Sequence, residues 1–480
     1  NRKRDGVMAE LDTKTPRPQA VEEAEEAGES NEYGLDSEAV GKVVDWLDEG
    51  ELDNVRALVD DLHDADEADL IEQIDPEYRR QLVDCLLPTG IDAEVFVHLR
   101  PSIRDEVLDY LPPEEIARTV TELDSDDAIE LVEDLDEERQ QEILAKLSSQ
   151  LRAQVEQGLT FPEESAGRLI QREVVALPQF WTVGKTVDYM RAAADQLPEH
   201  FYVVYVVDPL HRVVGAVNLS RLVRTRRSTK LEEIQETDIH PIPAEMDQEA
   251  VADVFRRYSL VSVPVVDENS RLLGMITFDD IVDVIDEEAE EDILRLAGVS
   301  AESDIYTDTF KTLKSRFVWL ALNLLTAVLA SMVIGVFEGT IDQIVALAVL
   351  MPIVASMGGN AGTQTLTVAV RALAMNELSA NTAWRVIAKE TLVASLNGII
   401  FAVVSGIVAS VWFGNPMLGA VIAMAMIATL AVAGLSGVMI PLALDKFGAD
   451  PAVASSVFLT TVTDIVGFFT FLGLAAWILL

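Results

Sequence analysis

Cysteine and positive charge are scarce in this sequence. The 480 residues include one cysteine, Cys85, and 36 Lys and Arg against 81 Asp and Glu, which gives a formal net charge of −45. A single cysteine excludes an intrachain disulfide and is typical of a reducing compartment. Because an acidic surface repels phosphate groups, we expect no nucleic acid among the partners.

Charge of either sign is almost missing beyond residue 300. Residues 301–480 carry 10 acids and 7 bases, whereas residues 1–300 carry 71 acids and 29 bases. This split excludes a single soluble globule. At roughly 150 residues per domain, the length predicts about three domains. We therefore predict a multidomain membrane protein whose first half is polar and whose second half is an all-α transmembrane domain.

Five apolar stretches in the second half are long enough to span a bilayer, which requires about 20 residues. We expect them at residues 317–337, 343–372, 386–413, 417–444 and 453–479. Basic connections between spans stay in the cytoplasm. We therefore predict a multi-pass protein of the cytoplasmic membrane, with a cytosolic N-terminal half and its C-terminus outside. The bases that set this orientation are Lys311, Lys314, Arg316, Arg371, Arg385, Lys389 and Lys446.

Asp464 lies in the fifth span, where an acid is costly because hydrocarbon cannot solvate its charge. Ser456 and Thr460 lie eight and four residues before it and share its helix face. We interpret this polar stripe as the lining of a water-filled path. A protonated or hydrogen-bonded structural acid is the alternative.

The second span contains Pro352 and a glycine-rich segment, Gly358-Gly-Asn360-Ala-Gly-Thr-Gln364. Proline removes a helix hydrogen bond and glycine permits other backbone conformations, so we predict an interruption of this helix at membrane depth. Such backbone is tolerated where it lines a cavity. With Asn360 and Gln364 nearby, an ion or substrate path is favoured over the alternative, close helix packing through small residues.

The first 160 residues combine an acidic tail with a helical repeat. Residues 1–34 contain little that could pack, and we predict a disordered tail there. From residue 35 to 160, leucines recur about every twelve residues, followed by capping residues and by acids that the helix dipole favours. This repeat predicts short stacked helices in an all-α superhelical domain. Its leucines are Leu99, Leu111, Leu123, Leu135 and Leu147.

A second repeat occupies residues 161–292. Residues 206–215 read Val-Val-Asp-Pro-Leu-His-Arg-Val-Val-Gly and match Val-Val-Asp-Glu-Asn-Ser-Arg-Leu-Leu-Gly at 265–274, an offset of 59. The β-branched runs and the turn residues predict strand, turn, strand and helix in each copy. We expect the two copies to pack face to face as a tandem α/β module.

The second repeat resembles a pair of cystathionine-β-synthase (CBS) domains, with the fuller pattern Gly274-Met-Ile-Thr-Phe-Asp-Asp280 in its second copy. The order of helical domain, CBS pair and five spans is similar to that of the MgtE family of magnesium channels. The motifs Gly358–Gln364, Asp450-Pro and Thr463-Asp464 agree with this resemblance, which covers about residues 35–480. It implies an N-terminal helical domain (35–160), CBS domains (161–227 and 228–285), a connecting plug helix (286–312) and a transmembrane domain (313–480).

The resemblance further implies a homodimer with a pore between the two membrane halves and Mg²⁺ as its ion. Mg²⁺ gives up its hydration water reluctantly, so carboxylate, amide and hydroxyl oxygens are suited to hold the hydrated ion through its waters. The pore residues implied in this way are Asp464, Asn360, Ser456 and Thr460.

Acids crowd the segment that leads from the second CBS copy toward the membrane. Asp280, Asp283, Glu287 and Glu291 fall near one helix face, where like charges repel until cations neutralise them. We interpret the segment as a Mg²⁺ sensor whose bridging ions draw the cytosolic domains together and close the pore. A solvated face and adaptation to high salt are the alternatives. The resemblance assigns the sensor role to Asp280, Asp283, Asp286, Glu288, Glu291, Asp292, Asp247, Glu249, Asp126 and Glu130.

Some members of the family bind ATP in the CBS pair. In this sequence Arg221 stands where an acid would contact the ribose, which argues against nucleotide binding. Tyr205 could stack on a base, although a tyrosine in a strand is more often buried.

The preferred function is a Mg²⁺-selective channel for uptake across the cytoplasmic membrane, closed by cytosolic Mg²⁺ and without enzymatic activity. One alternative is a secondary transporter that couples a divalent cation to H⁺ or Na⁺ through Asp464. Another is a CBS-type sensor that acts on a membrane partner. The expected partners are Mg²⁺, the lipid membrane and a second copy of the chain.

Overall fold

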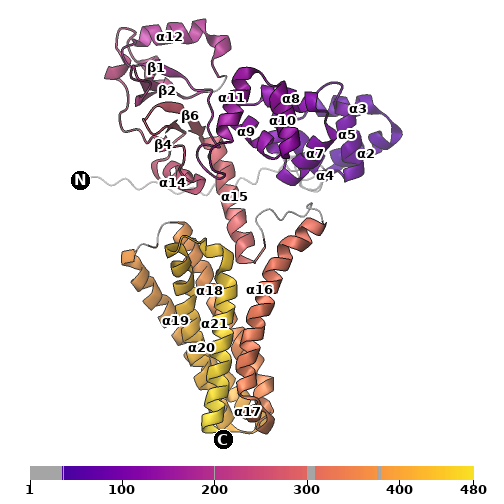
Figure 1. Cartoon of the computed structure of the whole chain (residues 1–480), viewed down its shortest axis with the longest axis vertical. Helices are drawn as coiled ribbons and strands as arrows, with labels where there is room; N and C mark the ends of the chain where they lie inside the picture. The colour runs from indigo at the N-terminus through magenta and orange to yellow at the C-terminus, as the bar shows by residue number, and fades with distance from the viewer. Residues whose placement is uncertain (1–34, 36, 199–200, 300–308, 376–377, 379) are drawn as a thin grey trace, which may run out of the picture. The chain divides into compact units, whose positions relative to one another are not determined.

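The protein is described from a computed structural model, which describes residues 35, 37–198, 201–299, 309–375, 378 and 380–480 (Figure 1). The tail predicted at residues 1–34 lies outside the described residues. The chain divides into two compact units, Asn1–Asp280 and Ile281–Leu480, which we describe in turn.

The first unit begins with ten described helices, joined by short turns. They are α2 (Ser37–Glu49), α3 (Leu52–Val59), α4 (Asp64–Gln73), α5 (Pro76–Leu86), α6 (Ala93–His98), α7 (Pro101–Tyr110), α8 (Pro113–Glu122), α9 (Ser125–Glu133), α10 (Glu137–Lys146) and α11 (Ser149–Gly158).

The predicted period of twelve residues is confirmed in this helical array. Helices α7 to α11 begin at residues 101, 113, 125, 137 and 149, because each helix of nine or ten residues is followed by a short turn. The five repeat leucines lie in the turns that end the helices, and all are buried in one hydrophobic core. Asp136 and Ser148 cap the next helices by accepting backbone N–H groups.

Two small sheets follow in the first unit, as the second repeat predicted. The first copy contains β1 (Ala176–Pro178), α12 (Val183–Ala192), the 3-10 turn η1 (Ala194–Gln196), β2 (Val203–Val207), β3 (Val213–Asn218), α13 (Leu219–Arg224) and η2 (Leu231–Glu233). The second contains β4 (Ile242–Pro243), α14 (Gln248–Tyr258), β5 (Ser262–Val266) and β6 (Leu272–Thr277), and leads into α15 (Phe278–Leu296), most of which belongs to the second unit.

The two sheets have the same topology and register. In each sheet the first strand runs parallel to the second, and the second runs antiparallel to the third. The pairs Val203–Asn218 and Ser262–Thr277 are equivalent at the sequence offset of 59. Arg212 and Arg271, which are also equivalent, pair with each other in an antiparallel bridge. The two copies are therefore related by a local two-fold axis at this bridge.

The second unit contains five helices long and apolar enough to span a membrane. They are α16 (Thr309–Val336), α18 (Ala346–Ala374), α19 (Ala380–Phe413), α20 (Pro416–Lys446) and α21 (Pro451–Ile478), with the short α17 (Glu338–Gln343) between the first two (Figure 1). Helix α20 packs against α18, α19 and α21, whereas α16 packs mainly against α21. These positions confirm the five predicted spans.

The predicted interruption of the second span is wrong, because α18 is one continuous helix from Ala346 to Ala374. Pro352 lies in its second turn, so only one backbone hydrogen bond near the helix start is lost. The glycines instead allow close packing. A Cβ atom at Gly358 would lie 2.6 Å from Thr429, and one at Gly362 would lie 3.0 Å from Leu459. The alternative of close packing through small residues therefore accounts for both glycines.

Candidate functional site

Asp464 lies in the middle of α21 and is half-buried. Its carboxylate makes no hydrogen bond or ion pair among the residues that the structure describes. The Thr460 hydroxyl, one turn earlier, donates to the backbone oxygens of Ser456 and Val457 at 3.0 and 3.1 Å. Its lone pairs still accept hydrogen bonds, so this face of α21 presents oxygens to a cation or to its hydration water.

The packing of α18 against α21 brings Asn360 close to the level of Asp464 in the second unit. Gly358 faces Thr463, and Gly362 faces Leu459, so the two helices run antiparallel and Asn360 lies between these two levels. Its side chain is exposed, and its amide nitrogen lies 3.5 Å from the Ser356 hydroxyl. This geometry brings three predicted pore residues, Asn360, Thr460 and Asp464, to neighbouring levels of two packed helices.

A row of polar side chains continues along the exposed face of α18. These residues recur every three or four positions, the spacing of one helix face. Hydrocarbon offers them no hydrogen bonds, so this face requires water or another protein surface in the membrane. The row consists of Ser356, Asn360, Thr363, Gln364 and Thr367, all of them exposed.

A second group of acids lies in the first unit, at the start of α9. Asp126 is 7% exposed, and its Oδ1 atom has no hydrogen-bond partner among the described residues. Burial, and then the neighbouring Asp280, Asp127 and Asp124, raise the pKa of Asp126 well above its ordinary value. The structure thus brings together Asp126 and Asp280, two acids that are predicted sensor residues from distant parts of the sequence.

Asp127 belongs to the same group, although sequence reasoning did not select it. Burial, followed by Asp280 and Glu130, raises the pKa of Asp127 to about 8. Burial and Glu173 also raise the pKa of Asp124. The sequence signal that could have selected Asp127 is the run Asp124-Ser-Asp-Asp127, which has more acids than the start of a helix requires.

Hydrogen bonds fix the start of α9 against the tandem α/β module. The Ser125 hydroxyl accepts the Arg172 backbone N–H at 2.7 Å and donates to the Glu173 carboxylate at 2.8 Å. Gln171 donates through its amide to Asp124 at 2.6 Å and exchanges backbone hydrogen bonds with Met275 on β6 at 2.8 Å. Asp280 follows β6 directly and accepts from the Thr277 backbone and hydroxyl. These bonds hold the acids of the group together despite their mutual repulsion.

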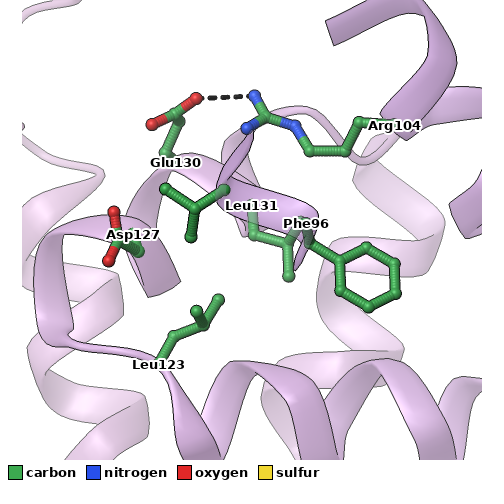
Figure 2. A pocket seen from close by; sticks show the side chains of 7 residues that line it. Phe96, Arg104, Leu123, Asp127, Glu130 and Leu131 are labelled. Carbon is green, nitrogen blue, oxygen red and sulfur yellow. Dashed lines mark hydrogen bonds and ion pairs between the residues drawn. The ribbon is translucent and has the colours of Figure 1, made fainter. Parts of the chain in front are cut away.

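Glu130 lies one turn after Asp126 but already has a cation partner. The buried guanidinium of Arg104 contacts Glu130 at 2.6 Å and Asp134 at 2.6 Å. Figure 2 shows this ion pair beside a shallow pocket, with Asp127 on the same helix directed away from Arg104. Glu130 therefore differs from Asp126, which has no cation beside it in the described residues.

Asp247 and Glu249 are exposed and lie at the start of α14. Asp247 is the N-cap of that helix, and its Oδ1 atom accepts the Glu249 backbone N–H at 3.0 Å. Asp247 therefore has a local structural role in addition to its predicted place in the sensor.

The remaining predicted sensor acids lie along α15. Asp283 and Asp286 are exposed, whereas Glu288, Glu291 and Asp292 are half-buried. Glu291 forms an ion pair with Arg295 one turn later. Burial raises the pKa of Asp292, and two other acids, Asp450 and then Glu288, raise it further. Asp450 was noted in the sequence only as part of a motif.

No preformed metal cage is found in the part of the chain that the structure describes. Its His, Cys, Asp and Glu side chains form no group of three or more that could hold a metal ion. The acids around Asp126 are near enough to raise the pKa of Asp126 and Asp127 but are not arranged as a ligand shell. A cation that binds there has to draw them together.

The residues considered for nucleotide binding are occupied by other contacts. Tyr205 is 1% exposed in the core of the tandem α/β module, and its hydroxyl lies 3.0 Å from that of Ser262. Its ring therefore cannot stack on a base without rearrangement of the core. Arg221 is exposed and pairs with Glu236 at 3.4 Å.

Family models match three parts of the chain. A model described as the divalent cation transporter MgtE matches residues 351–474. The MgtE intracellular N domain matches residues 62–164, and the CBS domain matches residues 231–287.

Curated relatives cover almost the whole chain. The magnesium transporter MgtE of Thermus thermophilus is 33% identical over 439 residues, which are 90% of this chain and 97% of the relative. The magnesium transporter MgtE of Bacillus subtilis is 30% identical over 438 residues, or 91% of this chain and 97% of the relative. The chain belongs to the MgtE family of magnesium transporters. The function named for these relatives, magnesium transport, is not enzymatic.

Two solved structures are similar to about half of this MgtE family member. The soluble part of a magnesium transporter is 29% identical with a TM-score of 0.46, covering 52% of this chain and 98% of that one. The cytosolic domain of the Mg²⁺ channel MgtE in complex with ATP is 31% identical with a TM-score of 0.47, covering 51% of this chain and 99% of that one.

Proposed function

We propose that the protein is a Mg²⁺-selective channel formed by a homodimer and closed by cytosolic Mg²⁺. The observation that carries the channel assignment is the polar surface on the helices of the second unit. Asp464 and the hydroxyl groups before it lie beside a helix whose exposed face bears Ser356, Asn360 and Gln364. A polar surface of this kind is costly in lipid and is explained by a hydrated ion path.

A second copy of the chain would complete this path. The polar row of α18 is exposed in a single chain, so a single chain leaves it open to lipid. Two copies facing each other through α18 and α21 would enclose the row and give the path two Asp464 carboxylates. The basic connections support a cytosolic N-terminal half and an external C-terminus.

The chemistry of the path suits a hydrated Mg²⁺ ion. Mg²⁺ keeps several of its waters in most protein sites and is held by few carboxylates. A carboxylate of Asp464 from each copy supplies charge, while Asn360, Ser456 and Thr460 supply oxygens that accept hydrogen bonds from the hydration shell.

Closure by cytosolic Mg²⁺ is supported by the acids at the start of α9. Asp126 is buried without a partner for Oδ1 and lies near Asp280, so the ionised carboxylates destabilise this contact. A divalent cation would remove that cost and draw the helical domain and the CBS pair together. Asp280 lies in the first turn of α15, the plug helix of this proposal, so the closed contact would restrain that helix.

Flux measurements on the purified protein in liposomes test the proposal. With equal pH and equal Na⁺ on both sides, we expect Mg²⁺ uptake driven by its own gradient. Raising Mg²⁺ on the cytosolic side to the millimolar range should then reduce the open fraction. Uptake that requires an H⁺ or Na⁺ gradient would contradict the channel and favour a coupled transporter. No transport at all would favour a sensor that acts on another membrane protein.

A further inference from the structure

A threonine of α20 lies directly behind the two helices that carry the polar surface. Thr429 is fully buried and contacts both of them through glycines. On α18 it faces Gly358, where a Cβ atom would lie 2.6 Å from the Thr429 methyl carbon. On α21 it faces Gly467, where a Cβ atom would lie 3.4 Å from that methyl carbon and 3.6 Å from the hydroxyl oxygen. The side chain of Thr429 therefore fills a space that two glycines leave open.

Both glycines are close in sequence to residues of the proposed path. Gly358 is two residues before Asn360, a rotation of about 200° around an α-helix, so Asn360 lies on the opposite face of α18. Gly467 is three residues after Asp464, so these two positions are only about 60° apart around α21. Thr429 thus supports α18 from behind Asn360 and supports α21 beside Asp464.

The hydroxyl group of Thr429 has no hydrogen-bond partner among the residues that the structure describes. Such a group is costly to bury, and a serine or threonine in a helix can avoid the cost by donating to the carbonyl oxygen four residues earlier. Thr365, Ser436 and Thr461, which lie on the same three helices, do so at 3.2, 2.6 and 2.6 Å. Thr429 lacks this bond, which indicates that its orientation is determined by the fit between the two glycines.

We propose that Thr429 is a spacer that holds α18 and α21 away from α20 and so sets the width of the ion path. This inference rests on the proposed homodimeric channel, in which α18 and α21 line the path, and it adds a residue that determines selectivity. Thr429 acts as a positioning residue, because its side chain lies behind the path and not in it. A smaller side chain at position 429 would let both helices move toward α20 and widen the path.

The width of the path matters because Mg²⁺ and Ca²⁺ differ in the coordination that they accept. Mg²⁺ requires octahedral geometry at about 2.0–2.1 Å, whereas Ca²⁺ takes six to eight oxygens at about 2.3–2.6 Å in flexible geometry. A wider and less rigid path therefore admits Ca²⁺ more readily while still admitting Mg²⁺. The ratio of Mg²⁺ uptake to Ca²⁺ uptake thus reports on the spacing. A merely structural role for Thr429 would lower both fluxes together and leave their ratio unchanged.

The test compares two variants of Thr429 in full-length protein reconstituted in liposomes. Thr429→Ser removes the methyl group and keeps the hydroxyl. We expect its ratio of Mg²⁺ to Ca²⁺ uptake to fall about tenfold, the lower end of the discrimination that one such group provides in a packed site. Thr429→Val keeps the shape and removes the hydroxyl, so its ratio should stay close to that of the wild type. Its unfolding temperature should not fall, because a buried hydroxyl without a partner is lost.

A matched variant and a compensating pair identify the methyl group as the cause. Thr391→Ser makes the same change at another hydroxyl without a partner in the described residues, on α19, which carries none of the path residues. It should leave the uptake ratio unchanged. Gly358→Ala places a Cβ atom against the Thr429 methyl group, pushes α18 toward the path and should lower Mg²⁺ uptake. Thr429→Ser in the same chain removes that contact and should restore uptake.

The possible outcomes separate the spacer from the proposed function. A wild type that does not discriminate against Ca²⁺ would contradict the Mg²⁺-selective channel itself. If the wild type discriminates and Thr429→Ser keeps the same ratio, the spacer alone is contradicted. An equal loss of selectivity in Thr429→Val would also contradict it, because the hydroxyl would then be decisive. Should Thr429→Ser not fold alone, its combination with Gly358→Ala carries the test, and failure of that pair to restore uptake would contradict the spacer.

Discussion

The two units of the molecule differ in the number and spacing of their acidic side chains. In the first unit, Asp126, Asp127 and Asp280 lie together, and burial and this proximity raise the pKa of Asp126 and Asp127. In the second unit, Asp464 is the acid at mid-span, and its neighbours are hydroxyl and amide groups. In the proposed function, the dense group responds to the concentration of a cation, whereas the isolated acid provides a place for one to pass. The comparison suggests that number and spacing, rather than acidity alone, separate sensing from conduction.

The largest effect is expected from Asp464→Ala. Without this carboxylate the path has no charge to replace the interactions that Mg²⁺ loses on entry, so we expect uptake to fall roughly a hundredfold, equivalent to about 2.7 kcal/mol in the barrier. Mg²⁺ flux into liposomes measures it. Asp445→Ala, at the exposed end of α20, is the matched control and should transport normally. Uptake that survives in Asp464→Ala with a normal dimer would remove Asp464 from the path.

The next largest effect is expected in the group formed by Asp126, Asp127 and Asp280. Asp126→Asn removes a buried carboxyl group that has no partner for Oδ1 and whose pKa is raised, so at alkaline pH without Mg²⁺ the protein should become more stable, by about 1–3 kcal/mol. The same change should weaken inhibition by Mg²⁺, because a ligand is lost. Thermal unfolding and flux assays check the two results, with Asp84→Asn, an exposed acid of α5, as control. A loss of stability would show that the Asp126 carboxylate is already neutralised.

The pH dependence of stability provides a further test of the comparison. The pKa of Asp127 is raised to about 8 from an ordinary value of 3.8, so the folded protein holds this proton more tightly than the unfolded chain. Its contribution to stability is therefore complete below about pH 4 and is lost as the pH rises through about 8. Without Mg²⁺, the unfolding temperature should fall between pH 5 and 9. Mg²⁺ should reduce that fall, because it takes the place of the proton. An equal slope in Asp127→Asn would contradict this assignment.

The smallest effect is expected for an acid that already has a cation. Glu130→Gln weakens a half-exposed ion pair with Arg104, so we expect a loss of stability of about 1 kcal/mol or less. Half-inhibition by Mg²⁺ should stay close to that of the wild type. If Glu130→Gln changed half-inhibition by Mg²⁺ as much as Asp126→Asn does, Glu130 would belong to the sensor. The distinction between acids with and without a cation partner would then be weakened.

Local patterns in the sequence were sufficient for most of the fold. The twelve-residue spacing of leucines reflects helix length plus turn length, and the 59-residue offset of the CBS copies reappears in their strand registers. The five spans follow from apolar length alone. The interruption predicted around Pro352 failed because glycine and proline in a membrane helix fit either broken backbone or close packing. Only the neighbouring side chains Thr429 and Leu459 decide between these.

The candidate site was harder to predict where it depends on distant partners. Asp464 could be found because an acid at mid-span is costly wherever it points. Nothing near Asp126 in the sequence indicates that it meets Asp280, or that Glu130 one turn later meets Arg104 instead. The pairing of Arg295 with Asp450 depends in the same way on how α15 ends against α21. Such contacts arise from tertiary packing, which a single sequence does not encode as a local pattern.

Limited proteolysis of the full-length protein tests the central claim most directly. The account predicts that millimolar Mg²⁺ protects the cytosolic half, because bridging ions draw Asp126 and Asp280 together. NaCl at the same ionic strength should give much less protection, since screening weakens repulsion without bridging the carboxylates. Asp126→Asn should lose the protection by Mg²⁺. Equal protection by both salts, or full protection by Mg²⁺ in Asp126→Asn, would contradict a sensor built from these acids.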